Sequence, residues 1–349
     1  MEAAMQLPND YRPGPARETG FSLVEMMLAM LIGMIIMGGI LSIYSNTRDT
    51  QRSSSDQLQL VADARFAIDT IAYDLRHAGV YGGTNLPTTI KCYKDDPQCT
   101  TPLLAAVGDC YASWYVDIVN PIFGGDEVVP AAYGCIADHE ANTDVLVVHY
   151  ADSNPIVTDE LASATAYVRS NYQGGELFIG TAIPDVPGDD ETDPSVLAPN
   201  QLTHNHLLYA RAYYVSDHTD TAGDSRPSLR RVNLVPGATG PAVEDQLILP
   251  GVVDFQVQYG VDTDEDKWVD QYVNADAVTK WSKVYAAKIW VLVRAEHTQK
   301  GLDTTQTFTL GGKVPATYGG TDGYRHLLLS SVVRLRNMQR VDESHAPGS

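Results

Sequence analysis

Signatures of catalysis are missing from this sequence of 349 residues. It contains no Walker phosphate loop, no G-x-S-x-G nucleophile elbow, no H-E-x-x-H zinc motif and no G-x-G-x-x-G dinucleotide fingerprint. The run Asp138-His139-Glu140 sets carboxylates beside an imidazole, but the sequence places no nucleophile with them. We therefore interpret the chain as a protein that is not an enzyme.

Basic residues are also scarce. The chain has 24 lysine and arginine residues against 44 aspartate and glutamate residues, which gives a formal net charge of -20. A protein with this excess of carboxylates repels the phosphate backbone of nucleic acids, and no local basic patch offsets it. The composition therefore argues against nucleic acid as the main partner.

Cysteine is rare, and its four copies are clustered at Cys92, Cys99, Cys110 and Cys135. An even, clustered set indicates disulfides formed in an oxidising compartment. Zinc is less favoured, because no C-x-x-C pair is present and the spacings are irregular. Four cysteines allow three pairings, and we predict the local one, Cys92 with Cys99 and Cys110 with Cys135.

Charge and proline are nearly absent from one long segment near the N-terminus. Between Glu18 and Arg48 the only charged residue is Glu25, and residues 26–44 are apolar apart from Ser42. A helix of about 20 apolar residues spans the roughly 30 Å hydrocarbon core of a bilayer. An ordinary signal peptide would place a cleavage site of small residues after this run, where the chain offers only a poor match. Residues 21–48 are therefore predicted to form a transmembrane helix.

The same helix is predicted to continue through residues 49–79, because apolar residues recur there at steps of three and four, namely Leu58, Val61, Ala64, Ile68, Ile71, Leu75 and Ala78. This apolar face should pack on a globular head, and Gly79 should end the helix as its C-cap glycine. The charged residues of this half, Arg65, Asp69, Asp74 and Arg76, are interpreted as a solvated helix face with spaced ion pairs.

The remainder of the chain is predicted to be rich in β-strands. Residues 80–140 hold the cysteines and many turn formers, and they are interpreted as a loop region between helix and sheet. Runs of β-branched and aromatic residues then predict strands at 144–150, 207–215, 246–259, 284–296 and 325–337. The expected fold class is α+β, in which a mainly antiparallel head formed by residues 141–349 packs on the second half of the long helix.

The residues just before the apolar run resemble the prepilin peptidase motif of type IV pilins, and they read Thr19-Gly20-Phe21-Ser22-Leu23-Val24-Glu25. The resemblance implies that prepilin peptidase removes residues 1–20 by cutting between Gly20 and Phe21 and that the new amine of Phe21 is methylated. Glycine suits such a site, because it lets an enzyme approach the backbone closely. A carboxylate at the edge of a membrane segment is costly without a partner. The resemblance implies that Glu25 pairs with the N-terminal amine of a neighbouring subunit.

Three further stretches, residues 64–69, 73–83 and 327–337, resemble the PilW family of minor pilins. This resemblance implies a type IV pilin-like fold and a subunit that contacts other minor pilins and the major pilin through its N-terminal helix. It also implies insertion in the inner membrane of a Gram-negative bacterium with a periplasmic head, followed by incorporation into a pilus that supports twitching motility, adhesion or DNA uptake.

Two alternative functions remain open from the sequence. The first is a J-class pseudopilin of a type II secretion system, a class that resembles PilW because it also places one long helix under a β-rich head. From a different class, the chain could be a surface adhesin or hydrolase that is anchored by a pilin-type signal. An aromatic-lined groove or an arranged catalytic constellation would favour that second reading.

One acidic segment is a candidate calcium loop. Asp262, Asp264, Asp266 and Asp270 occupy the first, third, fifth and ninth places of a loop, a spacing that brings oxygen ligands to one centre in EF-hands. The pattern departs from an EF-hand, because Lys267 stands at the place of the turn glycine and Val273 replaces the bidentate glutamate. The alternative is a solvated acidic hairpin turn, and no other cofactor is expected.

Overall fold

The computed structural model describes residues 20–92, 114–130, 133–188, 202–299, 301–302, 305–313, 316–319 and 322–338. The chain divides into two units, residues 1–55 and residues 56–349. The helix α1 (Leu23–His77) contributes residues to both units. In the first unit, α1 is long and apolar enough to cross a membrane, and its apolar side chains are exposed. The prediction of one long N-terminal helix is therefore confirmed, and the helix runs from Leu23 to His77.

The second unit contains one large sheet of eight strands. These strands are β1 (Ile90–Lys91), β2 (Ile122–Gly125), β3 (Val145–Ala151), β4 (Ala166–Asn171), β5 (Gly174–Ile179), β6 (His204–Ser216), β7 (Ser228–Pro236) and β8 (Pro241–Pro250). Their main order is β1-β5-β4-β6-β3-β2, and β7 pairs with β6 and β8. The long strand β6 holds the sheet together, because it pairs with β3, β4 and β7.

A second sheet has four strands in the order β10-β9-β11-β14, and a separate hairpin is formed by β12 and β13. Their bounds are β9 (Val252–Val261), β10 (Gln271–Val273), β11 (Val284–Thr298), β12 (Thr305–Phe308), β13 (Ala316–Gly319) and β14 (Tyr324–Arg334). All strand pairs are antiparallel except β1 with β5. The expectation of a mainly antiparallel head is confirmed.

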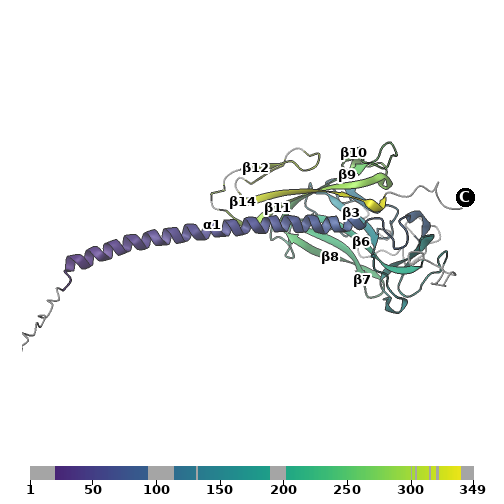
Figure 1. Ribbon diagram of the computed structural model, residues 1–349, viewed down its shortest axis with the longest axis horizontal. Helices are drawn as coiled ribbons and strands as arrows, with labels where there is room; N and C mark the ends of the chain where they lie inside the picture. Colours follow the sequence, from purple (N-terminus) through teal and green to yellow (C-terminus); the bar gives the residue numbers. More distant parts are fainter. Residues whose placement is uncertain are drawn as a thin grey trace, which may run out of the picture. The chain divides into compact units, whose positions relative to one another are not determined.

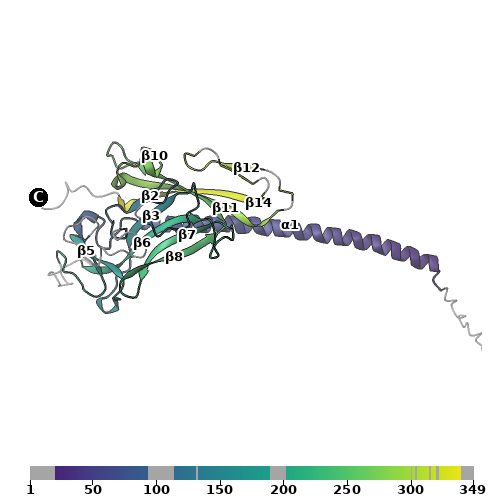
Figure 2. The same cartoon turned by 180° about the vertical axis from the view of Figure 1, so that it is seen from behind.

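The main core lies between the C-terminal part of α1 and the facing sides of both sheets (Figures 1 and 2). The buried helix residues include Leu60, Ala64, Ile71 and Leu75, which share one face because they recur at three- and four-residue steps. A second cluster, which includes Val147 and Val168, covers the other side of the large sheet. The large sheet is therefore buried on both faces, and its strand β3 is buried along its whole length.

The helix ends where the sequence predicts. Gly79 adopts a φ of 83°, which suits a glycine after the last helical turn, and its N–H donates to the carbonyl of His149 at 3.1 Å. A Cβ atom built on Gly79 would lie 3.2 Å from Sδ of Met338. Both the backbone conformation and the close packing therefore favour glycine at this position.

The strand predictions are confirmed in part. Strands occur at 145–151, 204–216 and 284–298, close to the predicted ranges. The single strand predicted at 246–259 is wrong, because the chain breaks at Gly251 with a φ of 87° and enters two strands of different sheets, β8 and β9. The last predicted strand ends at Arg334 and is followed by a 3-10 turn, Arg336–Met338. The hairpin of β4 and β5 and the strand β7 were not predicted.

Candidate functional site

The predicted processing site lies just before α1. Gly20 and Phe21 precede the first helical residue, Leu23, and the side chain of Phe21 is 87% exposed. Nothing lies within 4 Å of a Cβ atom built on Gly20. Among the described residues, the peptide bond between Gly20 and Phe21 is therefore open to an approaching enzyme. The leader residues 1–19 lie outside the described part of the chain.

Glu25 lies in the first turn of α1 and contacts its own chain. Its Oε2 accepts the N–H of Ser22 at 2.9 Å, and the carbonyl of Ser22 accepts the N–H of Met26 at 3.1 Å. Ser22 is thus the N-cap residue, and Glu25 fills the glutamate position of a capping box. The Ser-x-x-Glu spacing predicts this bond, but the sequence analysis missed it. Glu25 therefore satisfies a helix-end donor within the isolated chain.

Asp74 lies on the same helix, in the second unit, and corrects the expectation of a solvated face. Its side chain is 1% exposed, and its Oδ1 accepts from Nη1 of Arg211 at 2.6 Å and from the hydroxyl of Tyr150 at 2.8 Å. Its Oδ2 accepts from the hydroxyl of Tyr213 at 2.5 Å. A buried carboxylate is tolerated only when it is paired and hydrogen-bonded. We call Asp74, Tyr150, Arg211 and Tyr213 the helix anchor.

In the helix anchor, Arg211 stays charged and the hydroxyls of Tyr150 and Tyr213 stay protonated. Burial lowers the pKa of Arg211, but Asp74 and the two tyrosines raise it more, so the guanidinium stays charged. Burial, followed by the charge of Asp74, raises the pKa of Tyr150 and Tyr213, so both hydroxyls stay protonated and donate. The anchor therefore ties α1 to β3 and β6 through charge-assisted hydrogen bonds.

Residues after β14 hold the end of the same helix. The side-chain Nδ2 of Asn337 donates to the carbonyls of Arg76 at 3.0 Å and of Ala78 at 3.2 Å. The last carbonyls of a helix have no partner within the helix, so an amide from outside satisfies them. The helix is thus attached to the large sheet through Asp74 and to the second sheet through Asn337.

The cysteine predictions are only partly within the described residues. Cys135 is disulfide-bonded, and it directly precedes the buried residue Ile136. Cys92 is half-buried, with a φ of 62°. Cys99 and Cys110 lie outside the described residues. The pairing of Cys92 with Cys99 and of Cys110 with Cys135 therefore stays a prediction.

The acidic loop brings together three of its four predicted aspartates. Carboxylate oxygens of Asp262, Asp264 and Asp270 all lie within 4.8 Å of one another, and Asp262 is buried. Asp266 is outside this group, and its Oδ1 accepts the N–H of Trp268 at 2.8 Å. Lys267 has a φ of 68°, so it adopts the left-handed conformation that the EF-hand glycine position requires.

Backbone N–H groups of the acidic loop donate hydrogen bonds to the carboxylates of the same loop. Asp262 accepts from the N–H groups of Glu265 at 2.6 Å and Lys267 at 2.9 Å. Asp270 accepts from the N–H of Thr263 at 2.7 Å, and this bond, after the one from the Thr263 hydroxyl, lowers the pKa of Asp270. The loop therefore keeps Asp270 ionised, as a cation ligand must be.

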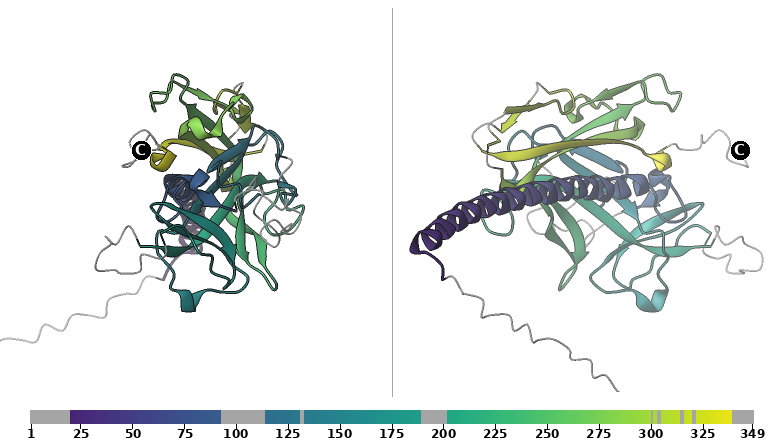
Figure 3. Two further views of the ribbon diagram at one scale, coloured as in Figure 1. Left: turned by 90° about the vertical axis from the view of Figure 1, so that its right-hand side faces the viewer. Right: turned by 60° about the vertical axis from the view of Figure 1, so that its left-hand side comes forward.

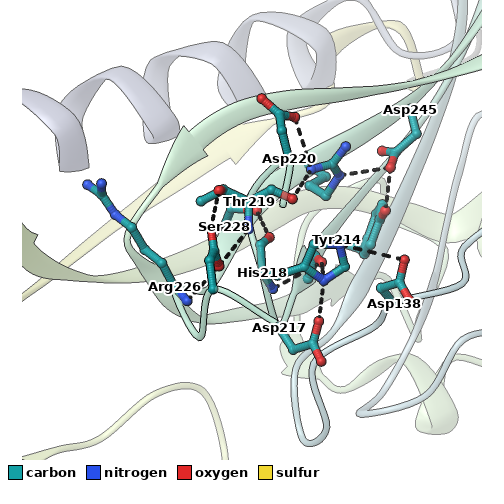
Figure 4. A network of polar contacts seen from close by, with 12 residues as sticks. Asp138, Tyr214, Asp217, His218, Thr219, Asp220, Arg226, Ser228 and Asp245 are labelled. Atoms are coloured by element: carbon teal, nitrogen blue, oxygen red, sulfur yellow. Dashed lines mark hydrogen bonds and ion pairs between the residues drawn. The ribbon is translucent and has the colours of Figure 1, made fainter. Parts of the chain in front are cut away.

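The loop between β6 and β7 carries a network of charges, drawn in Figure 4. Nδ1 of His218 lies 2.5 Å from Asp217, and its Nε2 lies 3.9 Å from Asp138. The hydrogen bond to Asp217 raises the pKa of His218. The hydroxyl of Ser216 also faces Nδ1, at 3.4 Å. A catalytic triad needs the nucleophile and a hydrogen-bonded carboxylate on opposite nitrogens. Here Asp217 and Ser216 share Nδ1, and Asp138 is too far from Nε2 for a hydrogen bond, so this network does not have that arrangement.

Comparisons with known proteins bear on both units. Residues 212–337 match the family described as Type IV Pilus-assembly protein W, and residues 15–41 match the prokaryotic N-terminal methylation motif. Among solved structures, the chain is similar to a type IV-like pilin from Thermus thermophilus, with 13% identity and a TM-score of 0.27, over 57% of this chain and 80% of that chain. No curated protein sequence matches the chain significantly.

Proposed function

We propose that the chain works as a minor pilin, because residues 212–337 match the family of type IV pilus-assembly protein W and residues 15–41 match the prepilin-type methylation motif. In this proposal, prepilin peptidase cuts between Gly20 and Phe21, and the processed chain waits in the inner membrane with its head in the periplasm. It then joins other minor pilins and the major pilin through α1 and helps to start assembly of the pilus.

The observation that carries the proposal is the order of features at the start of α1. An exposed Gly20-Phe21 bond is followed directly by an apolar helix whose first turn holds one carboxylate, Glu25. An apolar helix that stays attached after processing serves first as a membrane anchor and then as a filament contact. Once packed among apolar helices, Glu25 needs a positive partner, because a lone carboxylate is costly there. The new N-terminal amine of a neighbouring subunit supplies that charge.

The capping bond of Glu25 allows a sharp test. Glutamine accepts the N–H of Ser22 as glutamate does, so Glu25→Gln keeps the capping box and removes only the charge. We expect this variant to be cut at Gly20 but to be lost from sheared pili, as measured by intact mass and by immunoblotting of the pilus fraction. Incorporation at the normal level would contradict the ion-pair role.

Processing has its own test. Gly20→Val places a branched side chain at the cleavage site, and we expect the uncut precursor to accumulate in the inner membrane. The matched control is Gly33→Val inside the helix, where a built Cβ atom also has nothing within 4 Å. A Gly20→Val chain of mature mass would refute the assigned site.

Deletion with complementation separates the pilus from the type II secretion alternative. We expect loss of surface pili, twitching motility or DNA uptake, with normal release of secreted enzymes. Loss of secretion with normal pili would instead assign the chain to the J-class pseudopilins.

A further inference from the structure

The strand β14 forms an open edge of the second sheet. It pairs with β11 through residues 324–334, and no described strand pairs with its other side. Ser330, Val332 and Arg334 are exposed, and the side chain of Val332 is 54% exposed. An edge strand of this length presents a row of backbone N–H and C=O groups that can pair with another chain.

The backbone groups that face outward can be assigned from the register. Leu335 donates its N–H to the carbonyl of Tyr285, so the backbone N–H and C=O groups of odd-numbered residues in β14 bond to β11. The backbone groups of even-numbered residues point away from β11. His326 fits this assignment, because its N–H donates outward to Gln306 Oε1 at 3.3 Å. Within the described part of the chain, no partner reaches the N–H groups of Leu328, Ser330, Val332 or Arg334.

The sequence of β14 does not protect its open edge from pairing with another chain. Residues 327–333 read Leu-Leu-Leu-Ser-Ser-Val-Val, without charge, proline or glycine. Soluble proteins usually block such edges with lysine, proline or a bulge, because an unblocked edge aggregates. Arg325 and Arg334 flank the open stretch, and β14 has no acidic residue. The strand therefore favours an uncharged or acidic partner strand.

The direction of β14 restricts how two copies can meet. β14 runs parallel to residues 56–77 of α1, because Asn337 contacts the carbonyl of Arg76 while His297, near the start of β14, lies 3.5 Å from Asp56 (Figure 3). Copies anchored in one membrane have their helices in the same direction, a condition that rests on the proposed function. An antiparallel pair of two β14 strands would reverse one helix, so this symmetric dimer does not fit.

A complementary edge lies on the large sheet. The strand β8 pairs with β7 only. The end of β8 leads through Gly251 to Arg294, which pairs with His326 near the start of β14, so β8 runs opposite to β14. Glu244 and Asp245 are exposed on β8, where Asp245 is already paired with Arg230 at 2.8 Å, and the strand has no basic residue. In copies with parallel helices, β8 of one copy would therefore meet β14 of the next in an antiparallel arrangement with complementary charge.

We propose that the open edge of β14 accepts the acidic edge strand β8 of a second copy of this chain, which joins the large sheet of one head to the second sheet of the next. The contact is head-to-tail, so each copy keeps one edge of each kind free for a further copy. Main-chain hydrogen bonds supply affinity, and the paired charges set the direction.

Cysteine cross-linking in membranes tests this arrangement directly. One tagged full-length copy carries Val332→Cys, and a second, differently tagged copy carries a single added cysteine at one of residues 242–246. Because side chains alternate between the faces of a sheet, we expect cross-linked dimer at every second position, about fivefold above the positions between. The parent chain, with its native cysteines only, measures the background.

Two exposed valines provide matched variants. Val332→Lys places a charge on the open edge, and Val157→Lys does so at a loop residue that is 62% exposed. With the reporting cysteine moved to Ser330, we expect Val332→Lys to remove the cross-link and Val157→Lys to leave it.

Three outcomes would overturn the proposal. They are cross-linking without alternation, cross-linking of Val332→Cys to a different protein instead of a second copy, and equal effects of the two lysine variants. Intact mass of the same samples reports cleavage at Gly20, so failure of the edge contact in processed chains leaves the pilin function standing.

Discussion

The helix anchor gives the most direct test of how α1 is held to the head. Replacing Asp74 by alanine removes the acceptor of three hydrogen bonds and leaves the guanidinium of Arg211, whose side chain is 13% exposed, without its carboxylate. Removing one partner of a buried ion pair typically costs about 3–5 kcal/mol. We expect a loss of that size in the free energy of unfolding of the full chain in detergent, measured by urea unfolding and tryptophan fluorescence.

The control, Asp69, lies five residues earlier on the same helix. Asp69 is exposed, so Asp69→Ala should change the free energy of unfolding by about 0.5 kcal/mol or less. A double variant separates the cost of losing the Asp74–Arg211 ion pair from the cost of leaving Arg211 buried without a carboxylate. Asp74→Leu with Arg211→Met also removes the cation that Asp74→Leu leaves unpaired at Arg211, so it should be more stable than Asp74→Leu alone. If Asp74→Ala and Asp69→Ala cost the same, the inferred burial of Asp74 is wrong.

Three further predictions concern the head. Millimolar calcium should raise the melting temperature of the full chain, Asp264→Ala should abolish the rise and Asp266→Ala should retain it; an unchanged melting curve would identify a solvated turn. Burial raises the pKa of Asp144 to about 7, so the folded state binds the proton of this carboxyl more tightly than the unfolded state does. The contribution of the bound proton to the free energy of unfolding is therefore complete below about pH 4 and is lost as the pH rises through about 7. The loss is at most about 4 kcal/mol, and Asp144→Asn should flatten the pH profile of urea unfolding, which an unchanged slope would contradict. A disulfide between Cys110 and Cys135 should contribute about 2–4 kcal/mol, and a non-reducing peptide map that joins Cys135 to another cysteine would refute this pairing.

The sequence alone determined the features that depend on neighbours along the chain. The helix extent follows from the apolar run of residues 26–44 and the periodic residues after it, because a helix repeats every 3.6 residues. Gly79 marked the helix end, because glycine adopts positive φ without strain. The processing motif is likewise contiguous. Even the capping bond from Ser22 to Glu25 was readable from its three-residue spacing.

Burial of Asp74 was partly readable as well. It lies three residues after Ile71 and four before Ala78, so the same periodicity places it on the apolar face. Its charge nevertheless predicted an exposed side chain, because nothing in the helix sequence supplies a partner for a buried carboxylate. The partners come from β3 and β6, and only the packed structure brings Nη1 of Arg211 to 2.6 Å from Oδ1 of Asp74.

Tertiary structure alone decided the remaining features, because each depends on residues distant in the sequence. The run at 246–259 has the composition of one strand, but its halves pair with β7 and β11 in different sheets, which forces the break at Gly251. The acidic loop has four aspartates at EF-hand spacing, but its backbone turns bring only Asp262, Asp264 and Asp270 together. The open edge of β14 is likewise a property of strand order, because a strand's own sequence cannot specify whether it has one neighbour or two.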